Sequence, residues 1–241
     1  MMHELWDADL LLGRDPRTTN RVTTDDLVRW QQAQHITGGV LASLRAIHLD
    51  AASGNAEVAT AATSMGLRPA ITLETRDWLT ARRLLDEAPD ASLVRLAPQR
   101  QDCAPTHPGF RAMVNAALAR GFTIFCEGDV RTWGPAFEGR GATVVFLDLS
   151  FYHLGDFLAL AADEPGFHAS TRLLNGPDSL EIVRDELGMS RLVFGSRQGV
   201  HEGLAAVERL RTSRLSDDDR AAVAQHNLRR LLAEPTEQDH A

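Results

Sequence analysis

Carboxylates and arginines stand at the ends of the apolar runs of this chain, where side chains leave the core and can do chemistry. The carboxylates at these ends are Asp9, Glu74, Glu127 and Asp148, and the arginines are Arg45, Arg95, Arg172 and Arg197. A carboxylate buried beside like charges can have its pKa raised into the range for proton transfer. A guanidinium offers parallel N–H donors that fit a carboxylate or a phosphate.

We interpret these residues as the site of an enzyme. The candidates for catalytic proton transfer are Asp9, Glu127 and Asp148. The candidates for binding an anionic or polar substrate are Arg45, Glu74, Arg95, Arg172 and Arg197. The alternative is a structural ion network, in which the opposite charges only neutralise one another.

Strand-like and helix-like stretches alternate along the 241 residues, which predicts a parallel sheet with crossover helices. The expected strands are 5–12, 39–47, 67–73, 92–96, 122–126, 142–149, 166–172 and 192–195. The expected helices are 23–34, 55–65, 77–87, 109–120, 154–162, 179–187, 203–211 and 217–232. This order and length predict an α/β protein with one (β/α)8 TIM-barrel domain over residues 1–234 and a disordered polar tail over 235–241. Because function in such a barrel lies at the carboxyl ends of its strands, we expect the candidate residues to meet at one mouth.

Three segments resemble the amidohydrolase superfamily. Residues 190–197 read Ser-Arg-Leu-Val-Phe-Gly-Ser-Arg, similar to the eighth strand of the amidohydrolase-2 branch, which includes metal-dependent decarboxylases and lactonases. Residues 6–13 resemble its first strand, and residues 226–232 resemble its terminal helix. The resemblance implies an amidohydrolase-like TIM barrel and, by analogy, ranks hydrolysis first among the reactions.

The same resemblance implies a metal site whose ligands this chain has lost. The positions of the first-strand His-x-His motif fall on Asp9 and Leu11, and the eighth-strand aspartate falls on Arg197. The histidine of strand five falls near Cys126 or Glu127, and that of strand six falls near Asp148. An apolar or cationic side chain cannot ligate a metal, so we expect a divergent member with no metal and no other cofactor. The alternative is a hard cation such as Mg²⁺ held by the three carboxylates.

Composition excludes some chemistry. The chain contains no lysine, so Schiff-base catalysis and lysine-anchored pyridoxal phosphate are excluded. His153 and His201 follow expected strand ends and are candidate acids or bases if they fold over the mouth. Cys126 is expected to be a small buried apolar residue.

The expected partner is a small, anionic substrate. A net charge of −8 argues against nucleic acid and anionic membranes. We expect a cytoplasmic protein, because there is no secretory signal or membrane-spanning run and there are only two cysteines. A homodimer is left open.

The resulting hypothesis is a metal-independent, amidohydrolase-like enzyme. It would be a hydrolase of an ester, lactone or amide, or a related lyase or isomerase. The alternative is a non-catalytic pseudo-amidohydrolase that binds a ligand or a partner protein. Because the first and last strands are neighbours in a closed barrel, we also predict that Arg197 pairs with Asp9.

Overall fold

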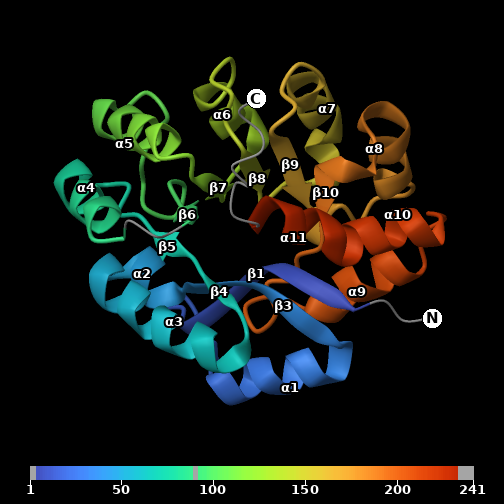
Figure 1. Ribbon diagram of the computed structural model, residues 1–241, viewed down its shortest axis with the longest axis horizontal. Helices are drawn as coiled ribbons and strands as arrows, with labels where there is room; N and C mark the ends of the chain where they lie inside the picture. The colour runs from blue at the N-terminus through green and yellow to red at the C-terminus, as the bar shows by residue number, and fades with distance from the viewer. Residues whose placement is uncertain (1–3, 89–91, 233–241) are drawn as a thin grey trace, which may run out of the picture.

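A ring of parallel strands surrounded by helices makes up the computed structural model, which describes residues 4–88 and 92–232 (Figure 1). The strands are β1 (Leu5–Arg14), β2 (Arg21–Val22), β3 (Ile36–Ser43), β4 (Arg68–Pro69), β5 (Ile71–Thr72), β6 (Leu93–Leu96), β7 (Thr123–Cys126), β8 (Val144–Phe146), β9 (Phe167–Ser170) and β10 (Leu192–Val193). The predicted tail over 235–241 lies outside the described residues.

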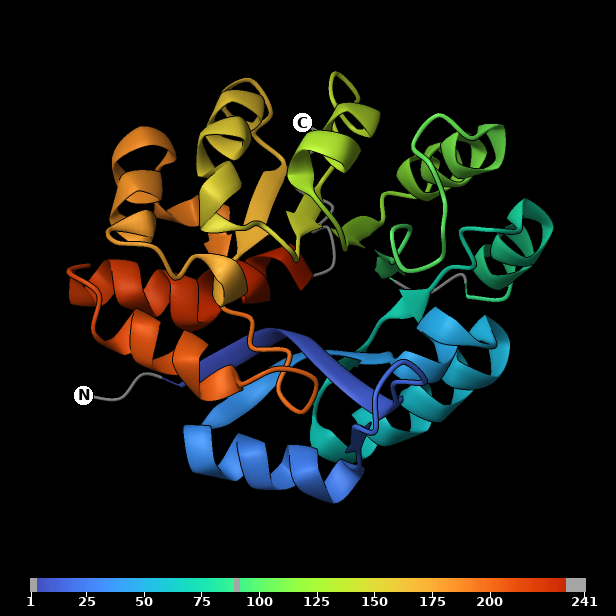
Figure 2. The same ribbon diagram turned by 180° about the vertical axis from the view of Figure 1, so that it is seen from behind.

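Helices follow the strands and cover the outside of the ring, as Figures 1 and 2 show from the two sides. The α-helices are α1 (Thr24–Gln34), α2 (Leu44–His48), α3 (Ala51–Met65), α4 (Trp78–Asp86), α5 (Pro108–Ala119), α6 (Val130–Trp133), α7 (Leu154–Ala162), α8 (Ser179–Leu187), α9 (Gly203–Arg211), α10 (Asp217–Ala221) and α11 (Asn227–Leu232). Short 3-10 segments are Gly134–Ala136, Phe151–His153, Thr171–Leu173 and Met189–Arg191, and a π-helical turn spans Ala222–His226. Among the described residues, no helix is long and apolar enough to cross a membrane.

The strand order is that of a (β/α)8 barrel. One run of neighbours is β5-β6-β7-β8-β9-β10, the other is β2-β1-β3-β4, and every pair except β1–β2 is parallel. The segments β4 and β5 form one strand interrupted at Ala70, whose N–H donates to the carbonyl of Leu41 at 2.8 Å. The two runs also meet between first and last strands, where the N–H of Ala8 donates to the carbonyl of Phe194 at 2.9 Å. The predicted barrel is confirmed.

The C-terminal helical segment lies across the junction of the first and last strands. It contacts both β1 and β10. The Asn227 amide donates to the carbonyls of Met189 and Leu192, both at 2.8 Å. The π-helical turn leaves the carbonyl of Val223 available to the N–H of Phe194 at 3.0 Å, since a π turn breaks the i to i−4 pattern of hydrogen bonds. These bonds join the last strand to the C-terminal helical segment.

The expected strand over 39–47 is wrong at its carboxyl end. The strand stops at Ser43, whose hydroxyl caps α2 by accepting from the N–H of Ala46 at 3.1 Å. The apolar run continues through Leu44 and Ile47, so the hydrophobic pattern did not mark the change from strand to helix. Arg45 therefore lies on a helix and not at the end of a strand. The expected strand over 166–172 is also too long, and Arg172 lies in the 3-10 segment after β9.

Close packing of β3 against β1 depends on Gly39, which lies beside Asp7. Gly39 has a φ of +143°, and a Cβ atom there would lie 2.1 Å from the Asp7 carbonyl oxygen. Only glycine allows this approach. The register of the two strands shifts between Asp7 and Leu10, the stretch that presents Asp9.

Candidate active site

Asp9 lies at the centre of a buried group of charges inside the barrel. Its side chain is fully buried, in the middle of β1. One carboxylate oxygen, Oδ1, accepts from Arg95 Nη2 at 2.7 Å, and the other, Oδ2, accepts from Arg197 Nε at 2.7 Å. Arg172 Nε lies 3.7 Å from Oδ2. The predicted pair between Asp9 and Arg197 is confirmed.

Glu127 is the second buried carboxylate, directly after β7. Its Oε1 accepts from Arg95 Nε at 2.8 Å, and its Oε2 accepts from Arg100 Nε at 2.6 Å. Arg197 Nη1 lies 3.7 Å from Oε2. Arg95 on β6 therefore bridges the carboxylates of Asp9 and Glu127.

Asp148 is the more accessible carboxylate, two residues after β8, with 20% of its side chain exposed. Its Oδ1 accepts from Arg172 Nη2 and forms an ion pair with Arg197 Nη1 at 2.9 Å. Its Oδ2 accepts from the backbone N–H of Gly128 at 2.9 Å. We call the connected set the mouth cluster: Asp9, Arg95, Arg100, Glu127, Asp148, Arg172 and Arg197.

The guanidiniums of the mouth cluster keep its buried carboxylates ionised. Burial opposes the ionisation of Asp9, but Arg197, Arg95 and Arg172 outweigh it and hold its pKa below the usual value. The pKa of Glu127 is lowered in the same way, against burial, chiefly by Arg95 and Arg197. In return, the surrounding carboxylates raise the pKa of Arg197 although burial opposes its charge. Four arginines thus face three carboxylates in the cluster, and the buried Asp15 lies 4.0 Å from Arg100 Nη1 as a fourth, so the charges balance.

Three guanidinium nitrogens of the mouth cluster have no hydrogen-bond acceptor among the described residues. They are Arg95 Nη1, Arg172 Nε and Arg197 Nη2, and each atom is inaccessible to solvent. A buried, charged donor without an acceptor costs more free energy than a satisfied one gains. A further anion bound in the cluster would supply the missing acceptors.

His201 is a titratable group beside the cluster. It lies on the loop after β10, and its backbone N–H donates to the Arg197 carbonyl at 3.0 Å. Burial, and then the charges of Arg172 and Arg197, lower the pKa of His201 below the usual value. The imidazole is therefore neutral at neutral pH, as a general base must be.

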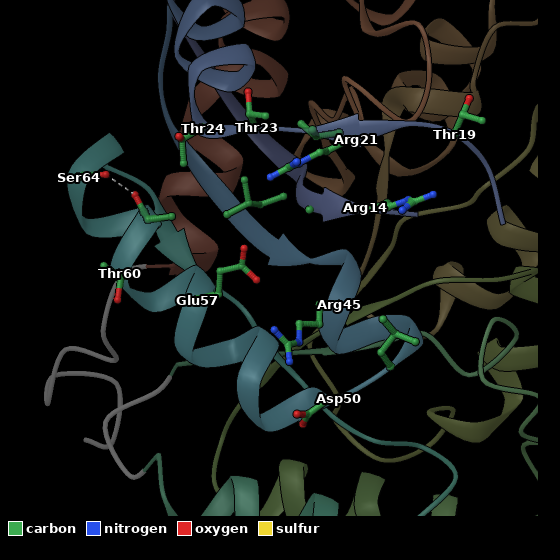
Figure 3. A pocket seen from close by; sticks show the side chains of 15 residues that line it. Arg14, Thr19, Arg21, Thr23, Thr24, Arg45, Asp50, Glu57, Thr60 and Ser64 are labelled. Carbon is green, nitrogen blue, oxygen red and sulfur yellow. Dashed lines mark hydrogen bonds between the residues drawn. The ribbon is translucent and has the colours of Figure 1, made fainter. Parts of the chain in front are cut away.

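Six of the eight residues predicted at the strand ends meet in the mouth cluster: Asp9, Arg95, Glu127, Asp148, Arg172 and Arg197. Glu74 is buried but pairs with its neighbour Arg76, with Nε to Oε1 at 2.6 Å. Arg45 is exposed on α2 and lines a groove of about 1090 Å³. Figure 3 shows Arg45 in this groove beside Asp50 and Glu57. Glu74 and Arg45 are therefore the two predicted residues that lie outside the mouth cluster.

Arg100 is the member of the cluster that the sequence did not reveal. It lies four residues after the end of β6, on a turn where its N–H donates to the carbonyl of Ala97 at 3.0 Å. Arg17 holds this turn through a bond from its Nη2 to the Arg100 carbonyl at 2.7 Å. The position of Arg100 depends on this contact between two loops, which the order of strands does not contain.

Solved structures with the same barrel include several amidohydrolase-2 proteins. Amidohydrolase 2 from Bifidobacterium longum subsp. infantis has a TM-score of 0.67 at 18% identity, covering 95% of this chain and 98% of that one. The 5-carboxyvanillate decarboxylase of Sphingomonas paucimobilis has a TM-score of 0.74 at 12% identity, covering 95% and 98%. A dihydroxybenzoic acid decarboxylase from Polaromonas with bound manganese has a TM-score of 0.76 at 11% identity, covering 96% and 97%.

The chain has the TIM-barrel fold of these solved structures. At these identities the likeness establishes the fold alone. No protein-family model matches the sequence, and no curated protein matches it closely enough to count as a relative. The function must therefore be argued from the site.

The residues at the metal position of this fold do not fit a metal ion. Both oxygens of Asp9 and both oxygens of Glu127 already accept from guanidiniums, and the Arg197 guanidinium lies among the carboxylates. A divalent cation there would have to displace these bonds and lie beside a fixed positive charge. In the described parts of the chain, no group of three or more His, Cys, Asp or Glu side chains is arranged to hold a metal.

Proposed function

We propose that this barrel is a metal-independent, amidohydrolase-like enzyme that binds a small anionic molecule at its mouth. The observation that carries the proposal is the set of three buried guanidinium nitrogens in the mouth cluster that have no hydrogen-bond acceptor among the described residues. A carboxylate on the substrate would accept hydrogen bonds from Arg172 and Arg197.

Asp148 and His201 are the groups we propose for proton transfer. Asp148 is the cluster carboxylate most exposed to solvent, and His201 lies close enough to Arg172 and Arg197 for their charges to lower its pKa. The catalytic roles of Asp9 and Glu127 stay predictions. Their buried, fully paired oxygens and lowered pKa suit the holding of arginines better than the exchange of protons.

Hydrolysis of an ester, lactone or amide is the reaction we place first. The neutral His201 imidazole could remove a proton from water, while Arg172 and Arg197 stabilise the oxyanion that develops on the substrate. A lyase or isomerase reaction of a small carboxylate would use the same groups, with Asp148 returning the proton.

A non-catalytic barrel that binds a ligand or a partner protein is the second candidate. It is favoured by the complete pairing of Asp9 and Glu127, whose four oxygens all accept from arginines without a substrate. Binding without turnover distinguishes this candidate from the enzyme.

The test begins with a thermal-shift screen of small carboxylates in the presence of a chelator. Compounds that stabilise the protein are then followed for turnover by proton NMR. Arg172→Gln should abolish the stabilisation, whereas Arg68→Gln, which changes an exposed arginine on β4, should leave it unchanged. His201→Gln should keep binding and lose turnover.

Three outcomes decide between the candidates. Turnover that disappears in His201→Gln supports the enzyme. Binding that depends on Arg172 without any turnover supports the non-catalytic barrel. If no carboxylate binds, or if binding is insensitive to Arg172→Gln, the proposed site is wrong.

A further inference from the structure

Asp7 is a buried carboxylate that accepts hydrogen bonds from two backbone segments of the mouth, one at Asp9 and one at Ser196. Its side chain is fully buried on β1. Its Oδ1 accepts from the backbone N–H of Asp9 and from the backbone N–H of Ser196, both at 3.0 Å. Its Oδ2 accepts from the Ser196 hydroxyl. One side chain thus connects the residue that forms the centre of the cluster with the residue that precedes Arg197.

The backbone of Arg197 needs such support. Arg197 has a φ of 52°, in the left-handed region that residues other than glycine rarely adopt. Strained backbone of this kind persists only where its surroundings fix it. Here the Ser196 hydroxyl also accepts from the N–H of Gln198 at 3.1 Å, and the Arg197 carbonyl accepts from the N–H of His201 at 3.0 Å. The residues on both sides of Arg197 are therefore held.

We propose that Asp7 is a positioning residue that sets the Asp9–Arg197 pair by holding the backbone of Asp9 and of Ser196 in one arrangement. One consequence of this proposal rests on the proposed function: loss of Asp7 should weaken the binding of an anion at the mouth. The geometry itself is independent of any ligand.

The electrostatics of Asp7 favour this role over a purely stabilising one. Asp7 makes no ion pair with an arginine in the described parts of the chain, unlike Asp9 beside it. Burial raises the pKa of Asp7 to about 6, against the three hydrogen bonds that favour its ionised form. At neutral pH the buried charge therefore lowers stability, and what the side chain contributes is the placement of two backbone segments.

Hydrogen exchange of arginine side chains tests the proposal without a ligand. In protein carrying ¹⁵N-arginine, the Nε–H of Arg197 donates to Asp9 at 2.7 Å, and that of Arg95 donates to Glu127 at 2.8 Å. Both signals should exchange slowly with solvent. In Asp7→Leu the Arg197 signal should exchange about tenfold faster or more, because its charged hydrogen bond is loosened. The Arg95 signal should stay protected.

Asp7→Asn should restore the protection of Arg197. Its carbonyl oxygen can accept from the two backbone N–H groups, and its amide can donate to the Ser196 hydroxyl. The matched control is Asn227→Leu, which removes a buried polar side chain that binds Met189 and Leu192 instead of Ser196. It should lower the melting temperature and leave the exchange of Arg197 unchanged.

Unchanged exchange of Arg197 in Asp7→Leu overturns the proposal. Equal acceleration of Arg197 and Arg95, in Asp7→Leu and Asn227→Leu alike, also overturns it, because Asp7 would then act only through global stability. If Asp7→Leu does not fold, Ser196→Ala removes one donor to Asp7 and should accelerate Arg197 by a smaller factor; no change there counts against the proposal as well. Failure of anion binding in the wild-type protein would refute the proposed function and leave this result standing.

Discussion

Replacing Arg197 by methionine should destabilise the protein strongly, because Arg197 is the cation shared by the carboxylates of the mouth cluster. Its side chain is 1% exposed, with Nε 2.7 Å from Asp9 and Nη1 2.9 Å from Asp148. In Arg197→Met, Asp9 keeps Arg95 as its hydrogen-bonding partner but stays fully buried near Glu127.

The expected magnitude follows from breaking a buried ion pair by removal of one partner, about 3–5 kcal/mol. For a chain of this size each kcal/mol lowers the melting temperature by about 2–4 °C, so the expected loss is roughly 6–20 °C. The loss should shrink in acid, because without Arg197 the pKa of Asp9 rises and the carboxylate takes up a proton instead of remaining a buried charge.

Urea unfolding at pH 7 measures the effect, and the double variant Asp9→Asn with Arg197→Met tests its cause. The double variant should be more stable than Arg197→Met alone, since it no longer buries an uncompensated charge. If Arg197→Met lowered the free energy of unfolding by less than about 0.5 kcal/mol, Arg197 would not stabilise the protein and the reasoning would be refuted. Strictly additive effects of the two substitutions would also refute the reasoning, since no interaction would then exist between the side chains.

Further predictions concern pH, metal and the outer groove. Asp7 has its pKa raised from 3.8 to about 6, so its contribution to stability is fully present below pH 3.8 and is lost as the pH rises through 6. Between pH 4 and pH 7, the free energy of unfolding of Asp7→Asn, measured with urea, should therefore rise relative to that of the wild type by on the order of 3 kcal/mol. The pKa values of Asp9 and Glu127 are lowered, so their contribution to stability is present above about pH 4 and is lost as the pH falls further. The melting temperature of Asp9→Asn should therefore approach that of the wild type below about pH 3. Arg197→Asp should not create a metal site, because the other arginines still occupy the carboxylates, and elemental analysis after dialysis against Mn²⁺ or Zn²⁺ should find no stoichiometric metal. Arg45→Gln should leave anion binding at the mouth unchanged in calorimetric titration, whereas an effect as large as that of Arg172→Gln would place Arg45 in the site after all.

Much of the mouth cluster could be predicted from the sequence because barrel topology is a strong constraint. The carboxyl ends of parallel strands in a closed ring lie on one side, so Asp9, Arg95, Glu127 and Asp148 meet although they are distant in sequence. The pairing of Asp9 with Arg197 follows from the neighbourhood of the first and last strands. The opposite charges at these ends then arrange themselves by electrostatics.

Two kinds of error came from local structure that hydrophobic pattern does not encode. Arg45 was placed at a strand end because the apolar run continues past Ser43, where a single capping hydroxyl starts α2. Arg100 was missed because it lies on a loop, and its approach to Glu127 depends on the turn at Ala97 and on Arg17. Hydrophobic periodicity carries neither signal.

The identity of Asp7 as a support for Arg197 also lay beyond the sequence. Its position on β1 suggested the motif of the first strand, but the bonds to Ser196 join residues 189 positions apart. Only the structure reveals that the left-handed φ of Arg197 follows directly after the residue that Asp7 holds.

The most direct test of the central claim is a crystal structure of the protein soaked with a small brominated carboxylate, located by the anomalous signal of bromine. The claim is that guanidinium nitrogens of the mouth cluster without an acceptor bind an anion. The predicted result is a carboxylate with an oxygen within about 3.2 Å of Arg172 Nε or Arg197 Nη2, and no such molecule in Arg172→Gln. Bromine found only at the surface or in the outer groove, with the mouth cluster unchanged, would contradict the account.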